Sequence, residues 1–157
     1  MPTTRNSLPD NTRKAMIALL NARLADAIDL RLAVKQAHWN VKGPTFIALH
    51  ELFDQIQGRV DVFVDDIAER AVTLAGVAEG TAQAAVKGSK LPPFPTNITA
   101  ESEILQAVAD RLAAFGKLAR EAIDGSDEAG DKDTADLFTG VSRQIDKDLW
   151  FVEAHLQ

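Results

Sequence analysis

Cysteine is absent from this chain of 157 residues, and tryptophan and methionine each occur only twice. Without cysteine there is no disulfide scaffold, no thiolate zinc site and no cysteine nucleophile. No stretch approaches the roughly 18 apolar residues that a membrane helix needs, and the N-terminus lacks the basic-then-apolar layout of a signal peptide. The sequence therefore predicts a cytoplasmic protein without a membrane partner, and leaves an association with the nucleoid open.

Positive charge is also in short supply, because 17 Lys and Arg residues face 23 Asp and Glu residues and give a net charge of -6. Such a chain as a whole repels nucleic acid and anionic membranes. Its composition is 46% hydrophobic and 25% charged, which is globular and excludes a disordered chain. The length predicts a single domain over residues 1–157, with residues 1–6 as a short flexible tail.

Strand signals are scarce, whereas helical periodicity runs through the chain. Apolar residues step by three and four along four segments: Ile17 to Leu32, Phe46 to Ile67, Ile104 to Ile123, and Leu137 to Leu156. The expected breaks are Gly43-Pro44, the Gly- and Pro-containing stretch 75–100 with a short helix at 81–86, Asp124-Gly125, and Gly130. This pattern predicts an all-α, ferritin-like four-helix bundle, with a short extra helix in the long crossover between helices 2 and 3.

The second long helix carries a polar face beside its apolar stripe. On a helical wheel, His50, Asp54, Asp65 and Glu69 fall within an arc of about 100°. The apolar stripe centres on a different face, so it packs inside the bundle and the polar face looks outward. Asp54 and Asp65 are separated by about 16 Å of helix, which no single metal ion can bridge.

The same four residues are arranged symmetrically about the midpoint of this helix. His50 and Glu69 lie equally far from residues 59 and 60, and so do Asp54 and Asp65; Gly58 is close to this midpoint. Two antiparallel copies would therefore bring the His50 of one chain to the Glu69 of the other. Two mixed nitrogen and oxygen sites per dimer result, and such ligands suit iron, zinc or manganese.

A further histidine supports the metal interpretation. His38 and His50 lie symmetrically about the Gly43-Pro44 turn, so an antiparallel hairpin places them at about the same height. Two alternatives stay open at this point. An acidic helix face is most often simply solvated, and a purely structural helical assembly would need nothing more than a polar interface.

Five segments together resemble the Dps family of mini-ferritins over roughly residues 8–157. They are Lys35-Gln-Ala-His-Trp-Asn-Val-Lys-Gly-Pro-Thr-Phe46, His50-Glu-Leu-Phe-Asp54, Asp65-Asp-Ile-Ala-Glu-Arg70, Thr134-Ala-Asp-Leu-Phe138 and Asp146-Lys-Asp-Leu-Trp-Phe151. Full-size ferritins and intrachain di-iron enzymes instead use Glu-x-x-His on two helices. That motif does not occur in this sequence.

The resemblance implies a homododecamer, a hollow shell of tetrahedral symmetry built from antiparallel dimers. It implies a two-subunit ferroxidase site that oxidises Fe(II) to Fe(III), with hydrogen peroxide as the preferred oxidant, and a ferric mineral stored inside the shell. This activity would protect the cell and its DNA from oxidative damage. By position, one subunit would supply His38, His50 and Asp54, and its twofold mate would supply Asp65 and Glu69.

Other residues are expected to support this chemistry or the fold. In the family, a tryptophan at the position of Trp39 is thought to intercept oxidising equivalents; the alternative is a tryptophan that packs at a helix end. Trp150 is expected to be structural, and His155 is not expected to be a ligand. Lys35 either pairs with an acidic residue across the interface or is solvated.

A dense acidic run is expected to open the last helix, and it consists of Asp124, Asp127, Glu128, Asp131, Asp133 and Asp136. The resemblance suggests an iron-entry pore that attracts Fe(II) by its negative potential, with Asp131, Asp133 and Asp136 as candidates. The alternative is a solvated helix start whose charges complement the helix dipole.

The rival function is a nucleoid protein that binds and condenses DNA, with iron binding secondary. DNA affinity depends largely on Lys and Arg contacts to phosphate. The first 14 residues offer Arg5, Arg13 and Lys14, and the last two are expected on the first helix. We therefore expect DNA binding to be weak or absent.

Overall fold

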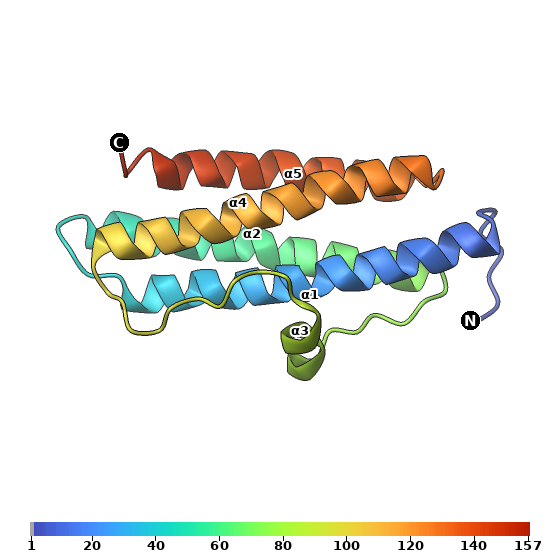
Figure 1. Ribbon diagram of the computed structural model, residues 1–157, viewed down its shortest axis with the longest axis horizontal. Helices are drawn as coiled ribbons and strands as arrows, with labels where there is room; N and C mark the ends of the chain where they lie inside the picture. Colours follow the sequence, from blue (N-terminus) through green and yellow to red (C-terminus); the bar gives the residue numbers. More distant parts are fainter. Residues whose placement is uncertain (1) are drawn as a thin grey trace.

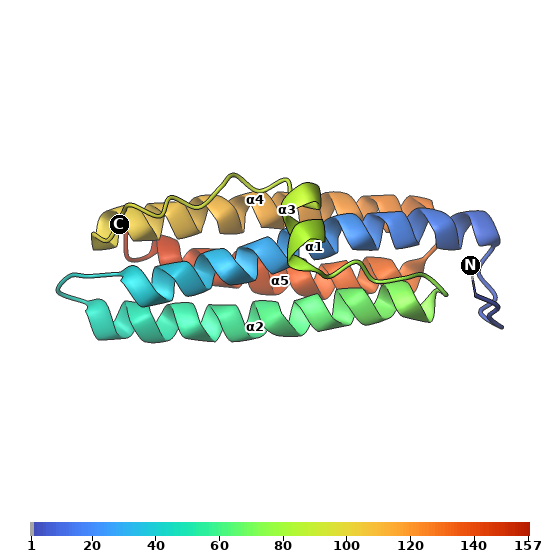
Figure 2. The same ribbon diagram turned by 90° about the horizontal axis from the view of Figure 1, so that it is seen from below.

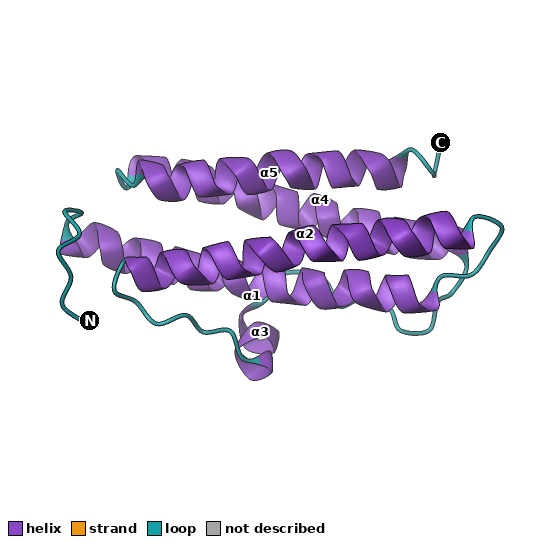
Figure 3. Cartoon of the chain, turned by 180° about the vertical axis from the view of Figure 1, so that it is seen from behind, coloured by secondary structure: helices purple, strands orange, loops and turns teal. Residues whose placement is uncertain are grey.

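The computed structural model describes residues 2–157, which form an elongated bundle of helices (Figure 1). The helices are α1 (Asp10–Asn40), α2 (Phe46–Thr73), α3 (Ala82–Gly88), α4 (Glu101–Glu128) and α5 (Lys132–Glu153). Within these residues no β-strand forms (Figure 3). One isolated parallel β-bridge joins Lys42 to Ala100. The expected all-α, ferritin-like bundle is confirmed; Met1, in the expected tail, lies outside the described residues.

Two antiparallel helical hairpins make up the bundle. α1 packs against α2 and α4 packs against α5, and most contacts between helices lie within these two pairs. The long crossover from α2 to α4 carries α3, which lies across α1 (Figure 2). Because the crossover returns along the whole bundle, α4 begins at the same end as the α1–α2 loop (Figure 1).

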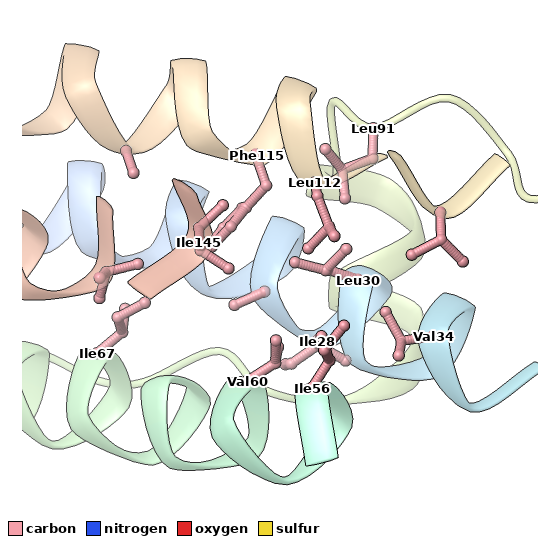
Figure 4. Packing of buried hydrophobic residues seen from close by; sticks show 14 of the residues in the cluster. Ile28, Leu30, Val34, Ile56, Val60, Ile67, Leu91, Leu112, Phe115 and Ile145 are labelled. Carbon is pink, nitrogen blue, oxygen red and sulfur yellow. The ribbon is translucent and has the colours of Figure 1, made fainter. Parts of the chain in front are cut away.

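The core lies between the two hairpins and follows the expected apolar stripes (Figure 4). Phe53, Phe115 and Phe138 are fully buried, together with leucines and isoleucines from all four long helices. Each such side chain stabilises the fold by about 1.5–3 kcal/mol relative to an exposed one. On α2 the buried positions are Leu49, Phe53, Ile56, Val60, Ile67 and Ala71, so the opposite face is left for the polar residues.

Of the two breaks expected between α4 and α5, the one at Gly130 is confirmed and the one at Asp124-Gly125 is wrong. The Asp124-Gly125 pair does not break the helix, which continues to Glu128. A Cβ atom at Gly125 would make an ordinary 3.4 Å contact with the Leu19 side chain, so the helix passes through this position without needing glycine there. The turn instead uses Gly130, whose φ of 82° is favourable for glycine.

The expected apolar stripes are not buried along their whole length. Leu32 is 55% exposed, and it lines an open groove with Val86 of α3. Trp150 was expected to be structural, yet its side chain is 62% exposed and lies beside the Phe151 ring.

Two carboxylates of α1 attach the crossover to the bundle. Asp26 is completely buried, lies 2.8 Å from the Arg23 guanidinium, and accepts a hydrogen bond from the Lys90 N–H at 2.7 Å. Asp29 accepts a hydrogen bond from the Ser89 hydroxyl at 2.6 Å. Burial raises the pKa of Asp26 above its usual value, although the Lys90 N–H and the Arg23 charge oppose the rise.

Two further ion pairs join α2 to α5. Arg59 donates hydrogen bonds from two nitrogens to the buried Asp148 carboxylate, at 2.6 and 3.0 Å. Arg70 donates to Asp131 at 2.8 Å, just before α5 begins. Such two-pronged Arg–carboxylate bonds fix the orientation of the groups they join. They therefore set how the α2 helix lies against the second hairpin.

No described helix is long and apolar enough to cross a membrane.

Candidate metal centre

Two histidines meet where α1 ends and α2 begins. His38 lies in the last turn of α1, and His50 lies in the second turn of α2. Their imidazole rings are stacked, with centroids 3.7 Å apart and planes inclined by 18°. The equal height expected from their symmetric placement about the turn is confirmed.

Each histidine is held by the backbone of the other. The Nδ1 atom of His38 lies 2.6 Å from the carbonyl oxygen of His50, and the Nδ1 of His50 lies 2.7 Å from the carbonyl oxygen of His38. A carbonyl oxygen can only accept, so both Nδ1 atoms donate. In the neutral rings the Nε2 atoms then carry free lone pairs. This is the form in which histidine binds a metal, with its other nitrogen hydrogen-bonded.

A carboxylate lies one turn after His50. Asp54 is exposed, and its Oδ1 lies 2.5 Å from the Lys35 ammonium group on α1. The hydrogen bond from Lys35 is the main reason why the pKa of Asp54 lies below its usual value; the nearby His38 and His50 add smaller effects. Asp54 is thus kept ionised as pH falls, with its Oδ1 bonded to Lys35.

The other two candidate ligands stand apart from the histidines. Asp65 and Glu69 are exposed farther along α2, on the side that faces away from the core. Within residues 2–157 no three His, Asp or Glu side chains gather closely enough to hold a metal ion. The chain therefore brings His38, His50 and Asp54 to one end of α2, and leaves Asp65 and Glu69 without them.

The outward face between these two groups is open. Nothing within the chain lies within 4 Å of a Cβ atom built on Gly58. The side chain of Val62 is 57% exposed, and that of Trp39, next to His38, is 65% exposed. Trp39 therefore does not pack at the helix end within one chain.

The predicted pore residues have different surroundings. Asp131 is 1% exposed and is the N-cap of α5, where it accepts hydrogen bonds from Thr134 and pairs with Arg70. Asp133 and Asp136 are exposed on the first turns of α5. The acidic run is also divided, because Asp124, Asp127 and Glu128 belong to the end of α4. Of the three pore candidates, Asp133 and Asp136 thus present free carboxylates at the surface.

The pairing of Lys35 with Asp54 was not predicted, although the sequence holds a signal for it. Lys35 lies three residues before His38, and Asp54 lies four residues after His50. The symmetry that matches the two histidines across the hairpin therefore also matches this pair. By contrast, no sequence signal indicates the two backbone hydrogen bonds between the histidines, because they depend on the shape of the loop.

Comparison with known proteins gives a consistent result. A family model described as a ferritin-like domain matches residues 17–157. The chain is 50% identical over 154 residues to the DNA protection during starvation protein of Agrobacterium fabrum, which covers 98% of this chain and 95% of that protein.

Solved structures agree. DpsC of Streptomyces coelicolor superposes with a TM-score of 0.95 at 30% identity, covering 99% of this chain and 91% of that chain. Dps of Mycobacterium smegmatis has a TM-score of 0.93 at 29% identity, covering 99% and 95%.

Proposed function

Because this chain belongs to the Dps family of ferritin-like proteins, we propose that it is a ferroxidase that detoxifies and stores iron. Twelve copies would form a hollow shell in the cytoplasm. Fe(II) is the substrate, hydrogen peroxide is the preferred oxidant, and the ferric product is stored as mineral inside. The relative from Agrobacterium fabrum is named for DNA protection, and removing Fe(II) and peroxide would protect DNA without contact.

The histidine pair is the observation that carries this proposal. Two imidazoles with hydrogen-bonded Nδ1 atoms present free Nε2 atoms beside the ionised Asp54. Mixed imidazole and carboxylate ligands bind Fe(II), and carboxylates also hold the harder Fe(III). One chain supplies too few of these groups in one place, which supports a site completed by a second copy.

In the proposed dimer, two α2 helices pack antiparallel with Gly58 near the twofold axis. His50 of one copy then meets Glu69 of the other, and Asp54 meets Asp65. The outward position of these residues and the open space at Gly58 support this arrangement. His38, His50 and Asp54 of one copy, with Asp65 and Glu69 of the other, would hold Fe(II).

The proposed reaction transfers one electron from each of two Fe(II) ions to one peroxide molecule. The O–O bond breaks, two protons are taken up, and two water molecules form beside two Fe(III) ions. Because both electrons reach the same peroxide, no hydroxyl radical is released. Trp39, exposed beside His38, would intercept oxidising equivalents that escape this pairing. Asp133 and Asp136 would draw Fe(II) toward the shell.

The test of the shared site uses two single variants. His50→Ala removes a ligand from the group that one copy gives to a site. Asp65→Ala removes a ligand from the group that the other copy gives to the same site. Either variant alone should oxidise Fe(II) with peroxide far more slowly than the wild type, measured by the absorbance of ferric product. His155→Ala, at an exposed histidine beyond the end of α5, is the matched control and should react normally.

Mixed dimers of the two variants give the decisive comparison. Both lesions then fall in one site, which leaves the other site intact, so about half of the activity per dimer should return. Verified heterodimers without recovery would mean that the ligands act within one chain. A wild-type protein that neither binds Fe(II) nor accelerates its oxidation would defeat the proposed function altogether.

A further inference from the structure

The N-terminus of α2 receives its hydrogen-bond acceptor from another helix. Within the described chain, α2 has no capping bond from its own Thr45 side chain and no acidic residue in its first turn. Helix N-termini need acceptors for their unpaired N–H groups. Glu101, in the first turn of α4, fills part of this need, since its Oε1 accepts a hydrogen bond from the Thr45 N–H at 2.5 Å.

A second bond attaches the same loop to the segment before α4. The Lys42 N–H donates to the Thr99 carbonyl oxygen at 2.8 Å, and Lys42 forms a parallel β-bridge with Ala100. Residues 42–45 are thus joined at both ends to residues 99–101, which lie at the same end of the bundle (Figure 1). We call these two bonds, with the Glu101 side chain, the Glu101 clamp.

Gly43 leaves the space that the clamp needs. A Cβ atom on Gly43 would overlap the Glu101 side chain, and the φ of Gly43 is 155°. A larger residue would therefore push the carboxylate away from Thr45. The loop sequence and the position of Glu101 are matched to each other.

The clamped loop is the one that joins the two histidines. His38 lies two residues before the end of α1, and His50 lies four residues after the start of α2. Each Nδ1 hydrogen bond crosses from one helix to the other. These bonds form only when the end of α1 and the start of α2 keep one relative height, and the five residues between the helices set that height.

We infer that Glu101 is a positioning residue for the metal centre: by holding the α1–α2 loop it keeps both histidines in the Nδ1–H form, with Nε2 free for metal. This inference rests on the proposed role of His38 and His50 as ligands. Glu101 itself touches neither ring and is not a ligand.

Three substitutions distinguish the positioning of the histidines by Glu101 from a general effect of its charge on the stability of α4. Glu101→Gln keeps a side-chain oxygen that can accept from Thr45, but removes the charge. Glu101→Asp keeps the charge near the N-terminus of α4, where it is favourable, but shortens the reach by about 1.5 Å. Glu101→Ala removes both. Glu103→Ala, at an exposed residue in the same turn, is the matched control.

The first readout needs no metal. The chain has three histidines, so nitrogen-15 solid-state NMR of histidine-labelled protein resolves each tautomer. We expect Glu101→Ala and Glu101→Asp to lower the Nδ1–H fraction of His38 and His50, whereas Glu101→Gln and Glu103→Ala stay like the wild type. His155, whose Nδ1 lies 2.7 Å from the Phe151 carbonyl oxygen, serves as the internal reference.

The second readout is the affinity for Co²⁺, an air-stable substitute for Fe(II). Changes around a metal ligand typically cost 10- to 100-fold in affinity, and for this more remote clamp we expect a loss of about 3- to 10-fold in the Ala and Asp variants. Wild-type tautomers and affinity in a folded Glu101→Asp protein would overturn the inference, as would a loss in Glu101→Gln equal to that in Glu101→Asp.

The two hypotheses fail separately. A wild-type protein that binds neither Co²⁺ nor Fe(II) would contradict the proposed function, while the tautomer comparison in metal-free protein still decides whether the clamp holds the rings. If Glu101→Ala does not fold, the comparison of Asp with Gln decides alone. Circular dichroism of each variant checks that the helices are intact.

Discussion

At the scale of single residues, two buried or paired carboxylates respond to their surroundings in opposite directions. The Lys35 hydrogen bond lowers the pKa of the exposed Asp54, whereas burial raises the pKa of Asp26. The stabilisation that the Asp54 charge provides is present above the ordinary pKa and is lost as pH falls through the lowered one. For Asp26 the sign is reversed, because the folded protein holds its proton more tightly than the unfolded chain does.

Asp26→Asn tests the reversed sign at Asp26. The variant keeps an oxygen for the Lys90 N–H but cannot titrate. We expect the stability of the wild type relative to Asp26→Asn to rise as pH falls from the raised pKa toward 3.8, by at most about 1.4 kcal/mol per pH unit. The free energies of unfolding of both proteins, measured at one protein concentration across this range, check the trend. A difference that grows with rising pH would mean that attraction to Arg23 outweighs burial.

At the scale of secondary-structure elements, the α2 helix keeps a glycine in its middle at a cost to its own stability. Glycine inside a helix is less favourable than alanine by about 1 kcal/mol, and no contact within the chain requires it at position 58. The proposed antiparallel packing of two α2 helices gives it a reason, since a missing side chain allows two helices to approach closely.

Gly58→Leu and Gly58→Ala together test that reason. We expect Gly58→Leu to fold but to lose assembly on size-exclusion chromatography, because overpacking costs about 1–3 kcal/mol at each dimer contact. Gly58→Ala adds one methyl group and should keep the assembly to a greater extent, with helix content unchanged by circular dichroism. A Gly58→Leu protein of wild-type size at low concentration would place the interface elsewhere.

The elements themselves were largely predictable from the sequence. Period and turn residues located four long helices and the short helix in the crossover, and symmetry about Gly43-Pro44 placed His38 against His50. The break expected at Asp124-Gly125 does not form, because a glycine inside a helix has the same sequence signature as one that ends a helix. The backbone conformation distinguishes the two, since Gly130 has a positive φ and Gly125 lies within α4.

The candidate site was less predictable, because its geometry depends on contacts distant in sequence. The candidate ligands follow from helical spacing. It stays a prediction that all five side chains act on one metal centre. The burial of Asp131 results from Arg70, 61 residues earlier, and the support of the α1–α2 loop results from Glu101, 56 residues after Thr45. No local sequence pattern predicts either contact.

At the scale of the whole molecule, charge predicts how an assembly meets DNA. Each copy adds a formal charge of -6, so a shell of many copies repels a phosphate backbone over about a Debye length, near 8 Å at physiological ionic strength. The cations that could oppose this repulsion are partly engaged, since Arg13 is buried and donates to the Leu74 carbonyl oxygen.

We therefore expect no retardation of linear duplex DNA by low-micromolar protein in a gel shift at pH 7.5 and moderate salt. The many short N-terminal segments of a shell offer a counterargument, because linked weak contacts act at raised effective concentration. Clear retardation without added iron or other divalent metal would show that this avidity exceeds the repulsion. Repeating the measurement at lower salt, where phosphate contacts strengthen, gives the sensitive control.

The order in which the chain is synthesised gives the two-hairpin architecture a consequence in time. The N-terminal part of a chain leaves the ribosome first, and synthesis adds about 5–20 residues per second. Residues 10–73 leave the ribosome before Glu101 does, so His38 can meet His50 before the Glu101 side chain can reach Thr45. A nascent chain then holds a histidine pair whose loop is still unsupported. On this view, docking of the second hairpin fixes the histidine pair in its final geometry, and a second copy of the chain then completes the proposed site.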